Sequence, residues 1–183
     1  MFITPNILSI FRICLVPVFV YVFFSPMENA RFWAVGIYVL ASATDVLDGW
    51  IARKYKMTTD LGRVLDPLGD KLLTASMLFC LSEAGVIPYL MFGIYIAKEV
   101  IMAAGGMLIH KRIGAGVPPS KFFGKLATVL IFITCVVLAL FEGIPRNTAL
   151  IMSSLAILVS VSALIVYVIS YADLLKINKK DAQ

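Results

Sequence analysis

Six predominantly apolar stretches, each about 20 residues long, constrain this chain more than any other feature. They cover residues 7–24, 32–51, 65–81, 89–109, 122–141 and 148–171. A helix of that length can cross the hydrocarbon core of a bilayer. Only 15% of the 183 residues are charged, against about a quarter in a soluble domain. The sequence therefore predicts an all-α fold, a polytopic integral membrane bundle of six transmembrane helices.

Lys and Arg residues are distributed unevenly among the connecting segments. With six spans, both termini and the segments after the second and fourth spans share one side of the membrane, and these regions hold most of the Lys and Arg residues. The opposite segments hold only Arg31 and Arg146. Because positive residues are retained on the cytoplasmic side, we expect both termini at the cytoplasmic face of a cell membrane. This asymmetry accounts for most of the net charge of +5, and we expect no nucleic-acid partner.

The remaining bulk features predict one domain, residues 1–183. No Lys or Arg precedes the first apolar stretch, and no small-residue cleavage site follows it, so we expect a retained span rather than a signal peptide. Cys14, Cys80 and Cys135 fall in three different apolar stretches. This placement predicts packing residues, and neither a disulfide framework nor a zinc site.

Four aspartates lie where the second and third apolar stretches meet, within TDVLDGWIARKYKMTTDLGRVLDPLGDK, residues 44–71. If the second stretch continues as a helix, positions i, i+3, i+4, i+7 and i+8 form one stripe along it. These positions are Asp45, Asp48, Gly49, Ala52 and Arg53. Carboxylates one turn apart can share a cation, and the two small residues leave room for a ligand against the backbone. The planar guanidinium can bind a phosphate.

The third stretch begins with Asp66 and Pro67, a pair typical of an N-cap followed by proline at the first helical position. Asp70 then lies in the first turn, on the same side as Asp66, where the helix dipole favours a carboxylate. Gly62, four residues before Asp66, keeps the approach open if the helix extends that far back. Simple helix capping is the alternative explanation for these aspartates.

Capping does not account for all four aspartates together. A carboxylate at membrane depth costs about 3 kcal/mol, and four close together also repel one another. They can stay ionised if positive charge is bound among them, which Arg53 and divalent ions can supply. Oxygen ligands in this number suit Mg²⁺ or Mn²⁺, and two such ions about 4 Å apart can serve a displacement at phosphorus. The pattern predicts a metal site that faces a diphosphate.

The same residues resemble the signature of a known family. Asp45-x2-Asp48-Gly49-x2-Ala52-Arg53-x8-Gly62-x3-Asp66-x3-Asp70 is similar, at all eight positions, to the motif of the CDP-alcohol phosphotransferases. The opening TPNILSIFR, residues 4–12, and LDPLGDK, residues 65–71, look like the bacterial phosphatidylglycerophosphate synthase branch. The resemblance covers essentially the whole chain.

This resemblance implies a phosphatidyltransferase that moves the phosphatidyl group of CDP-diacylglycerol to an acceptor hydroxyl and releases CMP. It implies that Asp45, Asp48, Asp66 and Asp70 hold two Mg²⁺ or Mn²⁺ ions, and that Asp70 is also the general base. It further implies a homodimer that is embedded in the membrane and contacts its phospholipids, with the active site at the cytoplasmic face. The CDP-binding residues that it implies are Asp48, Gly49, Ala52, Arg53, Gly62 and Asp66.

The acceptor is not determined by this motif, because the motif binds the donor. The segment HKRIGAGVPPSKFFGKLAT, residues 110–128, presents cations on the expected cytoplasmic side. They could anchor the protein at the membrane surface, or they could bind an acceptor phosphate such as that of glycerol 3-phosphate. SKFFGKLAT also resembles the Ser-x3-Gly-Lys-x-Lys-Thr segment of phosphatidylglycerophosphate synthases, although its spacing differs and Ala127 replaces the second lysine. The candidate acceptor-phosphate residues are Arg112, Ser120, Lys121 and Lys125.

Several polar residues outside the motif have more than one explanation. Lys98 and Glu99 lie mid-span and should face the bundle interior, as an ion pair with Arg12, as polar residues of the site, or in contact with substrate. His110 is more typical of an interfacial residue than of a catalyst. Asn6 and Arg12 are candidates for contact with lipid or with the acceptor.

We expect glycerol 3-phosphate to be the acceptor, which makes phosphatidylglycerophosphate the product. Three alternatives remain open from the sequence. The same chemistry could use another acceptor, namely phosphatidylglycerol for cardiolipin, inositol phosphate or serine. A small membrane transporter could use intramembrane carboxylates, although the two halves show no matching broken helices. A non-catalytic membrane scaffold leaves the clustered aspartates unexplained.

Overall fold

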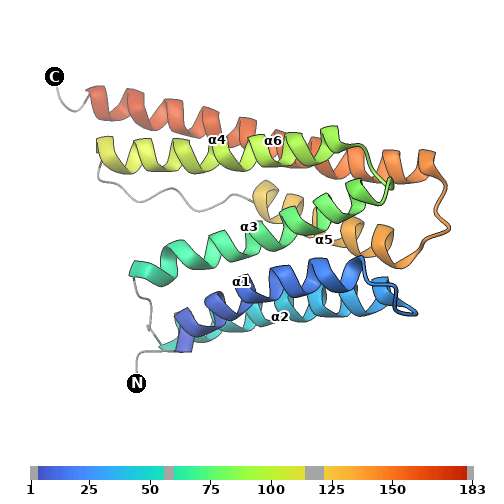
Figure 1. Ribbon diagram of the computed structural model, residues 1–183. Coiled ribbons are helices and arrows are strands. Elements are labelled where there is room, and N and C mark those ends of the chain that lie inside the picture. Colours follow the sequence, from blue (N-terminus) through green and yellow to red (C-terminus); the bar gives the residue numbers. More distant parts are fainter. Residues whose placement is uncertain (1–3, 56–59, 114–121, 181–183) are drawn as a thin grey trace. The chain divides into compact units, whose positions relative to one another are not determined.

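The computed structural model describes the backbone of residues 4–55, 60–113 and 122–180, and the side chains of residues 11–44, 68–107 and 124–169. Within these residues the chain forms six helices and no strand, as predicted. Each helix overlaps one apolar stretch of the sequence, and the helices are labelled in Figure 1. Their bounds are α1 Thr4–Phe23, α2 Ala30–Tyr55, α3 Asp60–Glu83, α4 Tyr89–Ile113, α5 Phe122–Leu140 and α6 Arg146–Lys180.

The helices belong to two compact units. The N-terminal unit comprises Met1–Val86 and Cys135–Ile144, and the C-terminal unit comprises Ile87–Thr134 and Pro145–Gln183. In the N-terminal unit, α1 contacts both α2 and α3, and α2 also contacts α3. α1 and α3 run in the same direction, with α2 antiparallel to both (Figure 1). In the C-terminal unit, α4 packs against α6.

The core of the N-terminal unit contains large apolar side chains from all three of its long helices. Phe19 of α1, Tyr38 of α2 and Met77 of α3 are each at most 1% exposed. The rings of Phe19 and Tyr38 have centroids 6.0 Å apart, at a tilted angle of 44°. Ala34 and Ala41 are also buried on α2, and such small residues let helix backbones approach closely. These contacts pack α1 against α2 and α3, the two helices that carry the aspartate motif.

Two turns in this unit depend on a residue with positive φ. Asn29, with φ 58°, precedes α2, and asparagine tolerates this conformation better than most residues. Gly85, with φ 71°, ends α3. Its N–H donates to the carbonyl of Ser82 at 3.0 Å, and the Val86 N–H donates to that of Leu81 at 3.0 Å, which is the Schellman arrangement. The helix therefore has a defined C-terminal cap.

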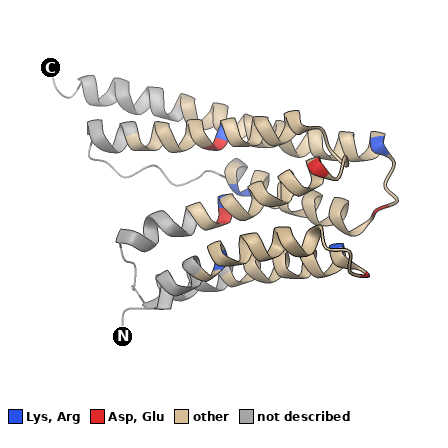
Figure 2. Cartoon of the chain, viewed as in Figure 1, with Lys and Arg blue, Asp and Glu red and all other residues tan. Residues whose placement is uncertain are grey.

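Two of the described helices are long and apolar enough to cross a membrane. They are Tyr89–Met107 within α4, with mean hydropathy 1.4, and Arg146–Ile169 within α6, with mean hydropathy 2.5. Shorter apolar helical segments are Phe11–Phe23, Ala30–Thr44 and Gly124–Leu140. Charged residues are sparse along the described parts of the helices (Figure 2). The six-span topology and the cytoplasmic termini stay predictions.

The described surface has many exposed apolar side chains. Leu90 on α4 is 71% exposed, and Ile151 and Leu158 on α6 are 68% and 65% exposed. An apolar surface of this kind suits lipid better than water. Of the three cysteines, Cys80 and Cys135 are buried, as expected of packing residues, whereas Cys14 is exposed.

Candidate active site

The five site residues predicted on the second apolar stretch all lie on α2, in its last three turns. The backbone is helical from Ala30 to Tyr55, so the predicted register exists and places these positions along one face of the helix. Their side chains lie outside the described ones. The residues are Asp45, Asp48, Gly49, Ala52 and Arg53.

The third helix corrects one sequence prediction. We expected Asp66 as the N-cap and Pro67 as the first helical residue, but α3 already begins at Asp60. Proline removes one backbone hydrogen bond and crowds the preceding turn, yet a long helix stabilised by packing can continue through it, as α1 does through Pro17. As a consequence, Gly62, Asp66 and Asp70 all lie on one helix at intervals of four residues.

Asp70 is the one predicted acid whose side chain is described. It is half-buried on α3, ten residues after the start of the helix, which corresponds to about 15 Å along the axis. The described side chains contain no group of three or more His, Cys, Asp and Glu that could hold a metal ion. The other three predicted ligands lie outside the described side chains, so the metal site stays a prediction.

A buried arginine of α1 contacts α3 beside Asp70. Arg12 is 2% exposed. Its Cδ and Nη1 atoms lie 3.6 Å from the position that a Cβ atom would take on Gly69, and Ile13 Cγ1 lies at 3.7 Å. Arg12 therefore packs beside Gly69, at the turn of α3 that carries Asp66 and Asp70. Sequence reasoning named Arg12 but not this contact.

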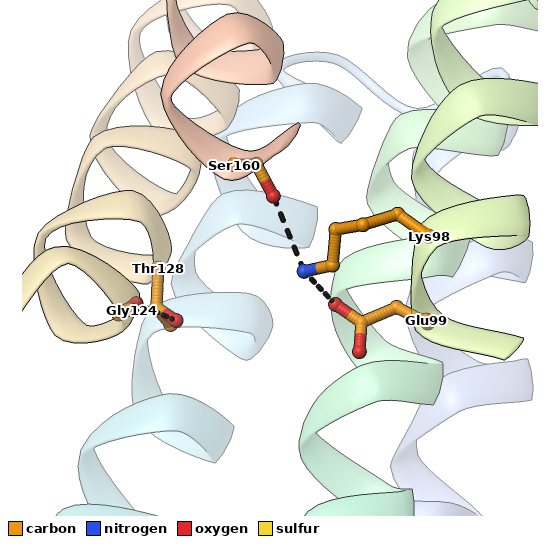
Figure 3. A network of polar contacts seen from close by, with 5 residues as sticks. All are labelled: Lys98, Glu99, Gly124, Thr128 and Ser160. Atoms are coloured by element: carbon orange, nitrogen blue, oxygen red, sulfur yellow. Dashed lines mark hydrogen bonds and ion pairs between the residues drawn. The ribbon is translucent and has the colours of Figure 1, made fainter. Parts of the chain in front are cut away.

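A second polar cluster lies between α4 and α6, in the C-terminal unit (Figure 3). Lys98 Nζ is 2.5 Å from Glu99 Oε1 and donates a hydrogen bond to Ser160 Oγ at 3.2 Å. The side chains of Lys98 and Glu99 are only 9% and 14% exposed. Both charges face the interior, as predicted for mid-span ions. Ser160, 1% exposed, was missed because a serine in an apolar stretch gives no periodic signal.

The candidate acceptor residues are only partly described. Arg112 is in the last turn of α4, and Lys125 is an exposed residue near the start of α5. Thr128, one turn after Lys125, donates its hydroxyl to the carbonyl of Gly124 at 3.1 Å. Ser120 and Lys121 lie outside the described residues. The side chains of His110 and Asn6 are also outside them, although both residues lie on helices.

Comparison with known proteins agrees with the motif. The CDP-alcohol phosphatidyltransferase family pattern matches residues 2–169. A CDP-diacylglycerol–glycerol-3-phosphate 3-phosphatidyltransferase of Haemophilus influenzae is 39% identical over 105 residues, which is 55% of each chain. A "Probable phosphatidylglycerophosphate synthase" of Mycobacterium tuberculosis is 33% identical over 170 residues, 89% of this chain and 78% of the relative.

A third relative carries a different name. A Mycobacterium bovis protein named for cardiolipin synthesis is 33% identical over 124 residues, 68% of this chain and 58% of the relative. In the Haemophilus influenzae comparison the chain spans about half the length of the curated relative. The family match, by contrast, covers nearly all of the sequence. This chain belongs to the CDP-alcohol phosphatidyltransferase family.

Proposed function

We propose that this protein transfers the phosphatidyl group of CDP-diacylglycerol to glycerol 3-phosphate, giving phosphatidylglycerophosphate and CMP. The observation that carries the proposal is the eight-position aspartate motif, which the backbone places on two helices, α2 and α3, of one compact unit. The names of the Haemophilus influenzae and Mycobacterium tuberculosis relatives support this donor and this acceptor.

The donor site is proposed at the junction of α2 and α3. Asp45, Asp48, Asp66 and Asp70 would hold two divalent ions, Mg²⁺ or Mn²⁺, because carboxylate oxygens are the ligands that these ions prefer. Such ions, when bound, neutralise the diphosphate charge. The small residues Gly49, Ala52 and Gly62 leave space for CDP along the helix faces, and Arg53 would bind a phosphate oxygen. Asp48 and Asp66 would contribute to the same pocket.

The acceptor hydroxyl attacks the phosphorus atom that bears the diacylglycerol group. A P–O bond forms to the acceptor, and the P–O bond to CMP breaks, so CMP leaves with the bonding electron pair. Asp70 takes the hydroxyl proton as the new bond forms, which is the role of a general base. A half-buried carboxylate can be reached by a substrate and is partly shielded from water.

The acceptor phosphate is proposed to bind the cationic segment that runs from the end of α4 to the start of α5. Lys125 is the exposed cation described there, and Arg112, Ser120 and Lys121 are the further candidates. Charge-assisted bonds to a phosphate favour glycerol 3-phosphate over acceptors that lack one. Asn6 and Arg12 stay candidates for lipid or acceptor contact. We also propose a multi-pass homodimer whose active site opens to the cytoplasmic face of the cell membrane.

A sibling acceptor is the second candidate function. The Mycobacterium bovis relative named for cardiolipin synthesis favours phosphatidylglycerol as that acceptor. The chemistry at phosphorus would be the same, because only the attacking hydroxyl changes. Inositol phosphate and serine are the remaining acceptors of this class.

One assay separates these candidates. Purified protein in detergent is given CDP-diacylglycerol and Mg²⁺, and CMP release is measured with glycerol 3-phosphate, phosphatidylglycerol, inositol phosphate or serine. We expect glycerol 3-phosphate to support the fastest release. Faster release with another acceptor would reassign the reaction within the family. Ion or proton flux through reconstituted vesicles without any lipid donor, together with no CMP release, would support the transporter instead.

A further inference from the structure

Arg12 carries a permanent positive charge into the interior of the N-terminal unit. It lies eight residues after the start of α1, which is about 12 Å along the helix axis. It is the buried arginine among the described residues, at 2% exposure. A guanidinium does not lose its proton in proteins, so this side chain cannot become neutral on burial as a lysine can. A buried charge of this kind requires opposite charge nearby.

Arg12 of α1 packs against α3. Two of its atoms, Cδ and Nη1, lie 3.6 Å from the point where Gly69 would carry a Cβ. Gly69 directly precedes Asp70 and follows Asp66 by three residues, a spacing that places neighbours on one helix face. The arginine of α1 is therefore packed against the turn of α3 that carries two of the four motif aspartates.

Burial and packing together indicate a role in the site. We propose that Arg12 is a positioning residue, whose side chain packs against the Asp66–Asp70 turn from α1 and keeps that turn of α3 in place. Side chains that support metal ligands orient them and tune their affinity. This inference rests on the proposed function, and it gives α1 a part in a site whose motif lies wholly on α2 and α3.

Two other roles for Arg12 predict different results. If Arg12 only packs α1 on α3, its replacement lowers the unfolding temperature and leaves the kinetics of the folded enzyme unchanged. If it binds the acceptor directly, replacement raises the KM for glycerol 3-phosphate and leaves kcat and metal binding unchanged. A positioning residue acts through the aspartates, so its loss lowers kcat and weakens metal binding.

The experiment compares Arg12→Met and Arg12→Lys with wild type in detergent. Methionine keeps an apolar stem of similar length without the charge, and lysine keeps the charge without the planar fork. Phe19→Leu is the matched control, because Phe19 is a fully buried residue two turns further along the same helix. For each variant we measure the unfolding temperature, kcat and both KM values, and Mn²⁺ binding by electron paramagnetic resonance in the absence of substrates.

We expect Arg12→Met to lower kcat and Mn²⁺ affinity by roughly 10- to 100-fold, with Arg12→Lys intermediate. Phe19→Leu should lower only the unfolding temperature. Wild-type kcat and Mn²⁺ affinity in the folded Arg12→Met protein, or a change confined to the acceptor KM, would overturn the inference. If Arg12→Met does not fold, the kcat and the Mn²⁺ affinity of Arg12→Lys test the inference instead.

The Mn²⁺ measurement separates this inference from the proposed function. If the wild-type protein binds Mn²⁺ but releases no CMP, the proposed reaction fails while the effect of Arg12 on metal binding is still measured. If wild-type activity is normal and the Arg12 variants bind Mn²⁺ like wild type, the inference about Arg12 fails and the proposed function stands.

Discussion

Lys98 Nζ donates a hydrogen bond to Ser160 Oγ at 3.2 Å and so joins α4 to α6 across 62 positions of sequence. The same ammonium group pairs with Glu99 and lies 5.5 Å from the centroid of the Tyr95 ring. A charged side chain within an apolar helix is costly unless such partners compensate it. The cluster therefore links the two described helices that are long enough to span a membrane.

Removing one charge of this cluster should destabilise the C-terminal unit strongly. Lys98→Met leaves the Glu99 carboxylate, 14% exposed, without its ammonium partner, and breaking a buried pair in this way costs about 3–5 kcal/mol. The double variant Lys98→Met/Glu99→Gln removes both charges and should recover a large part of that loss. Denaturant unfolding in detergent measures both, and a double variant no more stable than Lys98→Met would contradict the pairing.

Ser160→Ala tests the helix-to-helix bond separately from the ion pair. A hydrogen bond to a charged donor contributes about 1.5–3 kcal/mol, so the loss should be smaller than that of Lys98→Met. Ser162→Ala is the control on the same helix, because Ser162 is exposed and donates only to the carbonyl of Val159 in its own helix. Equal losses for the two serine variants would show that the contact with Lys98 contributes nothing.

The exposed ion pair of the N-terminal unit should behave differently. Arg31 Nε lies 3.3 Å from Glu142 Oε1, with side chains 27% and 67% exposed. Exposed pairs of this kind contribute about 0.2–1 kcal/mol. Glu142→Gln should therefore change the unfolding free energy only slightly, and less at high salt. A loss as large as that of Lys98→Met would mean that this pair is far less hydrated than its exposure indicates.

Length and apolar content were enough to predict all six helices and most of their ends. The start of α3 was predicted seven residues too late, because Pro67 was taken for the first helical residue. A sequence does not show whether a proline lies in the first turn of a helix, where its missing N–H costs no hydrogen bond, or in the helix interior, where it removes one. The other helix ends lie within four residues of the predicted limits, except that α6 continues nine residues beyond residue 171, to Lys180.

The contacts between helices could not be predicted in the same way. Several helices are apolar on all sides, so no amphipathic stripe indicates which face packs on which neighbour. For that reason the sequence predicted neither the contact of Arg12 with Gly69 nor the hydrogen bond from Lys98 to Ser160. The aspartate motif could be placed from the sequence, because residues three and four positions apart lie on one face of a helix.

Asp70→Asn should abolish CMP release. Asparagine keeps the size of the side chain but cannot accept the hydroxyl proton, and general-base catalysis typically contributes about 10²- to 10⁴-fold. The control is Ser76→Ala on the same helix, since the Ser76 hydroxyl donates only to the carbonyl of Leu72 at 2.7 Å. Turnover by Asp70→Asn within a few-fold of wild type, or wild-type turnover in excess chelator, would exclude the proposed mechanism.

Lys125→Ala should raise the KM for glycerol 3-phosphate and leave that for CDP-diacylglycerol nearly unchanged. One charge-assisted bond to a phosphate contributes about 1.5–3 kcal/mol, which corresponds to roughly a 10- to 150-fold change in affinity. Thr128→Ala is the matched control one turn along α5, because the Thr128 hydroxyl donates to the helix's own backbone. The measurement is CMP release at varied concentrations of each substrate. If Lys125 only anchors the protein at the lipid surface, its loss would change both KM values alike, because no single phosphate contact would be lost. Equal changes in the two KM values would therefore remove Lys125 from the acceptor site.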